Sequence, residues 1–86
     1  MPVISRFYGI VILMFFQDHN PPHFHAKYGG DQASIQIDNG AVVEGNLGTR
    51  TKRLVEEWRV LHQTELLEDW NRARARQPLN QIEPLE

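Results

Sequence analysis

The N-terminal two thirds of the chain alternate between apolar and polar side chains in short runs, a pattern typical of β-strands. The first two runs, Val3 to Phe7 and Ile10 to Phe16, meet at Tyr8-Gly9, where we expect a bend or a bulge. The second run is apolar on both of its faces, which indicates a central strand. After a proline-containing loop, the residues from His23 to Tyr28 alternate cleanly and predict another strand.

A further run, Ala33 to Ile37, has one apolar and one polar face, so it predicts a half-buried strand. The turn formers Asp38-Asn39-Gly40 follow it and close a hairpin. A three-residue loop with the glycine in the left-handed conformation sets Ile35 opposite Val43 on the buried face. The hydrophobic pattern therefore favours this loop over a two-residue loop.

The segment from Thr49 to about Arg76 has the spacing of a helix that ends before a proline. With a rotation of ~100° per residue, the apolar positions of its second half lie roughly a quarter turn around the helix from those of its first half. Either one long helix wraps over the sheet, or the helix breaks near Gln63-Thr64 into two short helices. Trp58 and Trp70 lie on these stripes, and we expect both to pack on the sheet.

Together the elements predict a single α+β domain over residues 1–86, with an antiparallel sheet of four to five strands packed on one long or broken C-terminal helix. A helix covers one face of a sheet, yet Val11, Leu13 and Phe15 make the second face of the central strand apolar as well. We expect the tail, residues 78–86, or a second subunit to cover them. A homodimer is therefore one expectation.

Composition narrows the functional classes. The chain has no cysteine, which excludes disulfides, thiolate zinc sites and cysteine nucleophiles. Nine Lys and Arg against eleven Asp and Glu give a formal net charge of −2, so nucleic acid is not favoured as a partner and would need a local basic patch. The longest apolar run is far shorter than the ~20 residues of a membrane-spanning helix, and no signal peptide is evident. We expect a cytoplasmic protein that does not enter the membrane.

Three of the four histidines fall within the segment DHNPPHFH, from Asp18 to His25. His23 and His25 are two apart on a strand, so their rings leave the same face about 7 Å apart, a spacing used for two ligands of one zinc or similar ion. His19 and Asp18 would complete the set, because two prolines restrict the loop that carries them. Zinc, manganese and nickel are the candidate ions. With water at an open position, such a site would hydrolyse phosphoester or nucleic-acid substrates, with Asp18 as a ligand or a base.

Two other interpretations of the histidines stay open. They form a polar sheet face and a loop held by hydrogen bonds to its own backbone, or they transfer protons and contact phosphate without a metal. Candidate anion-binding residues are Arg50, Lys52 and Arg53, which oppose the macrodipole at the helix start. Lys27 is a further candidate, on the strand face of His23 and His25.

The stretches MPVISRFYGIVILMFFQDHNPPHFHAKYG, EG, EW, LH, ELLEDW and IEPL resemble the small bacterial family called domain of unknown function 4160. The resemblance covers nearly the whole chain, and DHNPPHFHAKYG is its most specific stretch. The signature positions that it implies are Asp18, His19, Asn20, Pro21, Pro22, His23, Phe24, His25, Trp58, Trp70, Glu83, Pro84 and Leu85.

The resemblance implies a stand-alone α+β protein and assigns no catalytic role to any signature position. Members of the family are often encoded beside members of the domain of unknown function 2442 family, an arrangement that looks like a two-gene toxin-antitoxin or regulatory module. The first functional hypothesis is therefore an interaction module that binds the protein encoded by the neighbouring gene. The alternative is a metal-dependent hydrolase that uses His19, His23 and His25.

Overall fold

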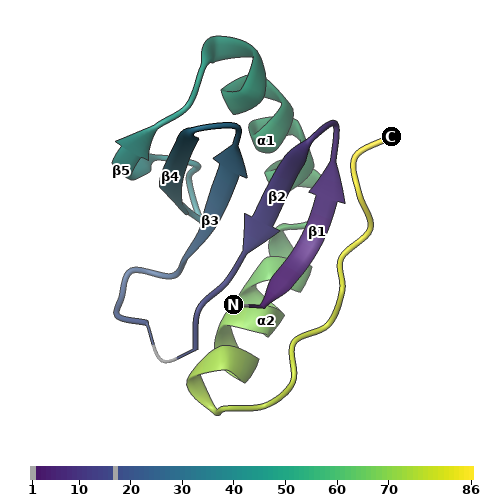
Figure 1. Cartoon of the computed structure of the whole chain (residues 1–86). Helices are drawn as coiled ribbons and strands as arrows, with labels where there is room; N and C mark the ends of the chain where they lie inside the picture. The colour runs from purple at the N-terminus through teal and green to yellow at the C-terminus, as the bar shows by residue number, and fades with distance from the viewer. Residues whose placement is uncertain (1, 17) are drawn as a thin grey trace.

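Consecutive strands form one antiparallel sheet in which each strand pairs with its neighbours in the sequence (Figure 1). The structure, a computed structural model, describes residues 2–16 and 18–86. In that part of the chain the strands are β1 (Val3–Phe7), β2 (Ile10–Leu13), β3 (His23–Tyr28), β4 (Asp31–Gln36) and β5 (Val42–Asn46). β1 and β5 are the edges of the sheet. The predicted α+β class and antiparallel sheet are confirmed.

The loop between β4 and β5 is longer than the sequence predicts. The backbone N–H of Gln36 donates to the carbonyl oxygen of Ala41 at 2.9 Å, so the turn spans residues 37–40. Gly40 has the expected left-handed conformation, with φ at 74°. Its N–H donates to the carbonyl oxygen of Gln36 at 3.0 Å and closes the turn.

This turn changes the register of β5. Ile35 pairs with Val42 instead of Val43, and a bulge follows between Ser34 and Ile35. The bulge accommodates one extra residue on β5 and sets Glu44 opposite Ser34. Because side chains alternate along a strand, Ser34 and Glu44 lie on the face of the sheet away from the buried Ile35.

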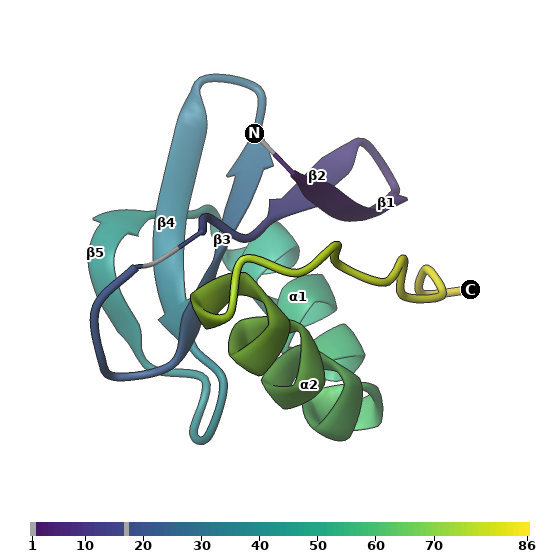
Figure 2. The same cartoon turned by 90° about the horizontal axis from the view of Figure 1, so that it is seen from below.

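Two helices, α1 (Thr49–Leu61) and α2 (Gln63–Arg74), pack on the same face of the sheet (Figure 2). The prediction of one long helix is wrong, because His62 lies between them with φ −122° and ψ 25°, outside the helical range. The junction adjoins Gln63-Thr64, where the sequence offers a break as the alternative. Neither helix of the described chain is long and apolar enough to cross a membrane.

The change of direction at His62 explains how both apolar stripes reach the sheet. Val55 and Trp58 are buried on α1, whereas Leu66 and Trp70 are buried on α2. In one straight helix the two apolar stripes would point about a quarter turn apart, so only one of them could pack directly against the sheet. A junction between two helices removes this conflict.

The core lies between the sheet and the helices, and Trp58 is its largest fully buried side chain. The Trp58 ring is fully buried, with its centroid 5.4 Å from that of Phe7 and 5.8 Å from that of Phe24. Trp70 belongs to the same cluster. The prediction that both tryptophans are core residues is therefore confirmed.

The C-terminal tail is fixed along β1 (Figure 1). The backbone N–H of Ile82 donates to the carbonyl oxygen of Ile4 at 2.8 Å. The side-chain amide of Gln81 donates to the carbonyl oxygen of Val3 at 2.7 Å. The indole N–H of Trp58 donates to the carbonyl oxygen of Glu83 at 2.8 Å. The tail therefore covers the outer edge of β1.

The tail does not cover the second apolar face of the central strand. Ile82 belongs to the core cluster on the helix side, whereas Leu13 pairs with His25 and belongs to the opposite face. Leu13 is nevertheless 4% exposed, and the Phe15 ring packs edge-on against His25 with a centroid distance of 4.3 Å. Coverage by the tail is thus a wrong prediction, and coverage by a second subunit stays a prediction.

Asp69 on α2 is a carboxylate inside the fold, with 0% exposure. One oxygen, Oδ1, accepts the backbone N–H of Asn80 at 2.8 Å, while Oδ2 has no hydrogen-bond partner among the described residues. Burial raises the pKa of Asp69 above its ordinary value, and the Asn80 hydrogen bond only partly offsets this effect. The charged form of Asp69 therefore opposes folding.

We expect Ile82→Ala to lower the free energy of unfolding by about 2–5 kcal/mol, because it removes a buried side chain that joins the tail to the core. Urea denaturation followed by circular dichroism measures the change. Leu61→Ala is the control, since that side chain is 67% exposed and its loss should cost less than ~0.5 kcal/mol. Equal, small losses in both variants would mean that the tail is not docked.

We expect Asp69→Asn to raise the melting temperature at pH 7 and to lose this advantage as the pH falls. The raised pKa of Asp69 in the folded state means that folding takes up a proton. The wild type therefore gains stability from this group as the pH falls through the folded-state pKa toward the unfolded value. Thermal denaturation of both proteins between pH 4 and pH 8 tests this, and a gap that does not change with pH would contradict it.

Candidate metal centre

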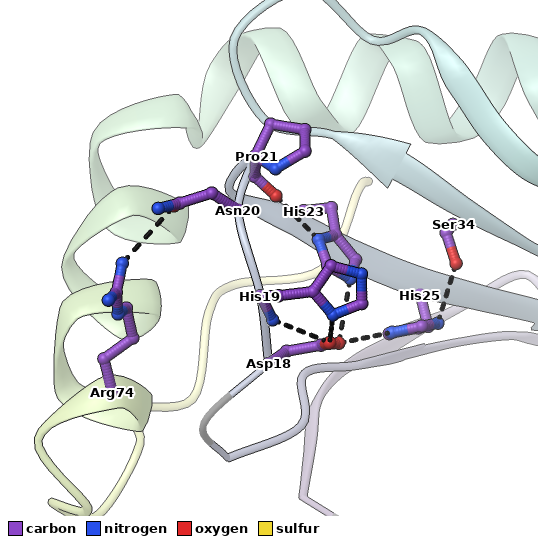
Figure 3. A network of polar contacts seen from close by, with 8 residues as sticks. All are labelled: Asp18, His19, Asn20, Pro21, His23, His25, Ser34 and Arg74. Carbon is purple, nitrogen blue, oxygen red and sulfur yellow. Dashed lines mark hydrogen bonds and ion pairs between the residues drawn. The ribbon is translucent and has the colours of Figure 1, made fainter.

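The loop between β2 and β3 carries Asp18 back over the first residues of β3 (Figure 3). β3 is held in place on both sides, because Leu13 of β2 and Ser34 of β4 each pair with His25. Figure 3 shows the Asp18 carboxylate among the rings of His19, His23 and His25. A strand paired on both sides and a constrained loop therefore build the cluster together.

Three donor atoms converge in this cluster. Asp18 Oδ2 lies 2.8 Å from Nε2 of His23 and 3.4 Å from Nε2 of His25. The ligand atoms of these three residues all lie within 4.8 Å of one another. The structure thus brings together three of the four residues predicted as metal ligands.

His19, the fourth predicted ligand, lies on the outside of the cluster. Its side chain is 92% exposed, and its Nδ1 lies 3.2 Å from Asp18 Oδ1, the carboxylate oxygen that does not contact the other two rings. Its backbone N–H donates to the same Oδ1 at 2.9 Å. His19 therefore holds Asp18 in place, and it does not belong to the group of converging donor atoms.

The hydrogen bonds of His23 fix the proton positions on its ring. Nδ1 lies 2.7 Å from the carbonyl oxygen of Pro21, which can only accept, so Nδ1 carries a hydrogen. In the neutral ring, Nε2 then has a lone pair that points at the carboxylate of Asp18, which is also an acceptor. Two acceptors in contact need something between them: either a proton, held by the ring or by the carboxyl group, or a metal ion.

Burial and hydrogen bonding set the charge states of the other two donors. Burial lowers the pKa of His25, although the hydrogen bond to Asp18 acts in the opposite direction. Burial acts to raise the pKa of Asp18, but hydrogen bonds from the His19 backbone and the His25 ring outweigh it, so this pKa is lowered. A neutral imidazole and a carboxylate, the forms that bind metals, are therefore favoured at neutral pH.

Beside the cluster lies a hollow of about 300 Å³. Its lining residues are Asp18, His19, Asn20, Pro21, His23, His25, Ser34, Val43 and Glu44. A second hollow, of about 150 Å³, shares His25, Ser34 and Glu44 with the first. A larger hollow of about 410 Å³, by Val60 and Leu61 on α1, contains no histidine.

Three further groups of this site are not predicted by the sequence. They are the Pro21 carbonyl oxygen, the Ser34 hydroxyl, which lies 3.2 Å from His25 Nδ1, and the Glu44 carboxylate. Gly29-Gly30 could have revealed Ser34, because a two-residue glycine turn sets the register of the hairpin. No comparable signal exists for Glu44, whose position depends on a bulge.

The predicted basic residues do not line the hollow beside the cluster. Arg50, Lys52 and Arg53 are exposed in the first turn of α1, and the latter two line a separate hollow of about 350 Å³. Lys27 is half-buried on β3, beyond His25. Anion binding by these residues stays a prediction.

The chain belongs to a family described as "Domain of unknown function (DUF4160)", whose profile matches residues 9–71. The matched part includes the cluster and both helices almost to their end. No curated protein and no solved structure matches the chain. The family description names no activity and no partner, so the interaction module and its neighbouring-gene partner stay predictions.

We expect Asp18→Asn to lower the pKa of His25 further, because the variant loses the carboxylate that acts to raise it. An NMR titration of the imidazole resonances measures this pKa in metal-free protein. Asp31→Asn, a change at the far end of the β3-β4 hairpin, is the control and should leave the pKa unchanged. A His25 pKa that rises in Asp18→Asn would contradict the geometry described above.

Proposed function

We propose that this member of the family called domain of unknown function 4160 binds one divalent ion, zinc, manganese or nickel, through Asp18, His23 and His25 and acts as a metal-dependent hydrolase. The observation that carries the proposal is the 2.8 Å contact between His23 Nε2 and Asp18 Oδ2, made by a ring whose Nδ1 faces the Pro21 carbonyl oxygen. With the hydrogen on Nδ1, Nε2 and the carboxylate are both acceptors, so the contact must hold either a proton or a metal ion.

The separations of the donor atoms suit a tetrahedral zinc site. Bonds of about 2.0–2.1 Å place tetrahedral ligand atoms about 3.3–3.4 Å apart. His25 Nε2 and Asp18 Oδ2 are 3.4 Å apart, and the 2.8 Å between His23 Nε2 and Asp18 Oδ2 would lengthen as an ion replaced the proton.

Each histidine also has the outer hydrogen bond typical of a metal ligand. The Nδ1–H of His23 donates to the Pro21 carbonyl oxygen, and Nδ1 of His25 lies within hydrogen-bond distance of the Ser34 hydroxyl. The Pro21 carbonyl can only accept and so fixes the tautomer of His23. The Ser34 hydroxyl can accept a hydrogen from Nδ1 of His25 when Nε2 of that ring faces an ion. Both rings therefore present the same nitrogen to the same point.

Two nitrogens and one carboxylate oxygen leave a position open, as catalytic zinc sites require. When bound, an ion there would polarise a substrate oxygen and lower the pKa of a water ligand to near 7. The chain itself supplies the rest: Asp18 offsets part of the charge, and the hollow of about 300 Å³ gives a substrate access to the cluster.

The proposal predicts one saturable site per chain. Protein purified without a His tag and treated with EDTA is titrated with Zn²⁺, Mn²⁺ or Ni²⁺ by calorimetry, and the bound metal is measured by mass spectrometry. We expect His23→Ala and His25→Ala each to weaken binding about 100-fold or more, since removal of an outer partner alone costs roughly 10–100-fold.

His19→Ala is the matched control, because this exposed ring lies outside the converging group and the backbone N–H that holds Asp18 remains, so affinity should fall far less than in His23→Ala. Circular dichroism of each variant establishes that it is folded. No saturable binding to the folded wild type, or equal losses in His19→Ala and His23→Ala, would overturn the proposal. In that case His23 and Asp18 form a proton-bridged pair that only anchors the loop.

A further inference from the structure

Glu44 is the other carboxylate that lines the hollow beside the cluster. It lies on β5 and pairs in register with Ser34, whose hydroxyl contacts His25. Glu44 and His25 together line both this hollow and the smaller one next to it. The two carboxylates of the hollow thus come from different elements, Asp18 from the loop before β3 and Glu44 from β5.

The charges around the hollow bear on the kind of substrate that fits it. Two carboxylates and three imidazoles line it, and its described lining contains no lysine or arginine. The guanidinium of Arg74 lies nearby but is turned to Asn20, whose Oδ1 it contacts at 3.3 Å. A phosphoester would bring its own negative charge toward Glu44, and only the bound ion, without help from a lysine or arginine of the described lining, would hold it.

We propose that Glu44 is the proton-transferring catalytic residue of this site and that the substrate is an uncharged carbonyl compound, an ester or an amide, instead of the phosphoester that the sequence suggests. This inference rests on the proposed metal-dependent hydrolase function. Glu44 suits the role because it is exposed, lies on a strand and forms no ion pair with any other described residue that would neutralise it.

The reaction balances without any further reagent. The oxygen of a water molecule forms a bond to the carbonyl carbon, and one of its protons passes to the Glu44 carboxylate. The bond from that carbon to the leaving oxygen or nitrogen then breaks, and the leaving atom departs with the electron pair. It takes the proton from Glu44, which returns to its starting form, so the products are an acid and an alcohol or amine.

The second hollow, of about 150 Å³, adjoins Glu44 on the other side and suggests where a small part of the substrate fits. Gly45 lines it with φ at 81°, and a side chain there would collide with the carbonyl oxygen of Gln32. Phe15 forms another wall of this hollow. Its volume suits a short acyl group better than a bulky one.

The test compares zinc-loaded wild type with Glu44→Gln, using p-nitrophenyl acetate and bis(p-nitrophenyl) phosphate as probes. Only the activity that EDTA removes is counted, because free imidazoles also cleave the acetate slowly. We expect zinc-dependent cleavage of the acetate alone, and a loss of about 10²–10⁴-fold in kcat for Glu44→Gln. Zinc affinity measured by calorimetry should stay within a few-fold, since Glu44 is not a ligand.

Glu57→Gln, the same change at an exposed position on α1 away from both hollows, is the control and should keep wild-type kcat. If zinc does not bind, or bound zinc supports no cleavage of either probe, the proposed function itself fails. If zinc binds and the acetate is cleaved equally by wild type and Glu44→Gln, only the role of Glu44 fails. Preferred cleavage of the phosphate diester would overturn the substrate class.

Discussion

The hydrogen bond from Nδ1 of His23 to the carbonyl oxygen of Pro21 is the contact on which the arrangement of the Asp18, His23 and His25 cluster depends. It spans only two residues, at a distance of 2.7 Å, and it acts on a ring that is 7% exposed. Because the ring cannot turn freely, its second nitrogen stays directed at Asp18. The whole cluster is therefore arranged by a backbone carbonyl that a search for side-chain motifs would not find.

The two kinds of support around the cluster differ in stiffness. His25 lies within a strand that is paired on both sides and is held by Ser34, whereas Asp18 lies in a loop and is held by the His19 backbone. The sheet fixes the imidazoles, and the loop supplies the carboxylate. Such a division would let the carboxylate adjust by small movements while the imidazoles keep their geometry.

Local patterns in the sequence predict the elements well, but not features that depend on packing. The alternation of HFHAKY gives the bounds of β3 correctly, because one residue slip would reverse its buried face. The β4-β5 register cannot be predicted from the sequence. The longer turn and the bulge compensate for each other, and only packing of the whole sheet selects this combination. Asp18 and His23 could be brought together from the prolines between them, whereas Glu44 could not.

The two edges of the sheet differ in a way that limits how copies of this chain could join. The C-terminal tail occupies the outer side of β1, while β5 is the other edge and most of its residues are exposed. Strand addition between copies can therefore use β5 alone, and two β5 strands that pair with each other exhaust the open edges. Growth by this route stops at a pair, so the sheet cannot polymerise into a filament.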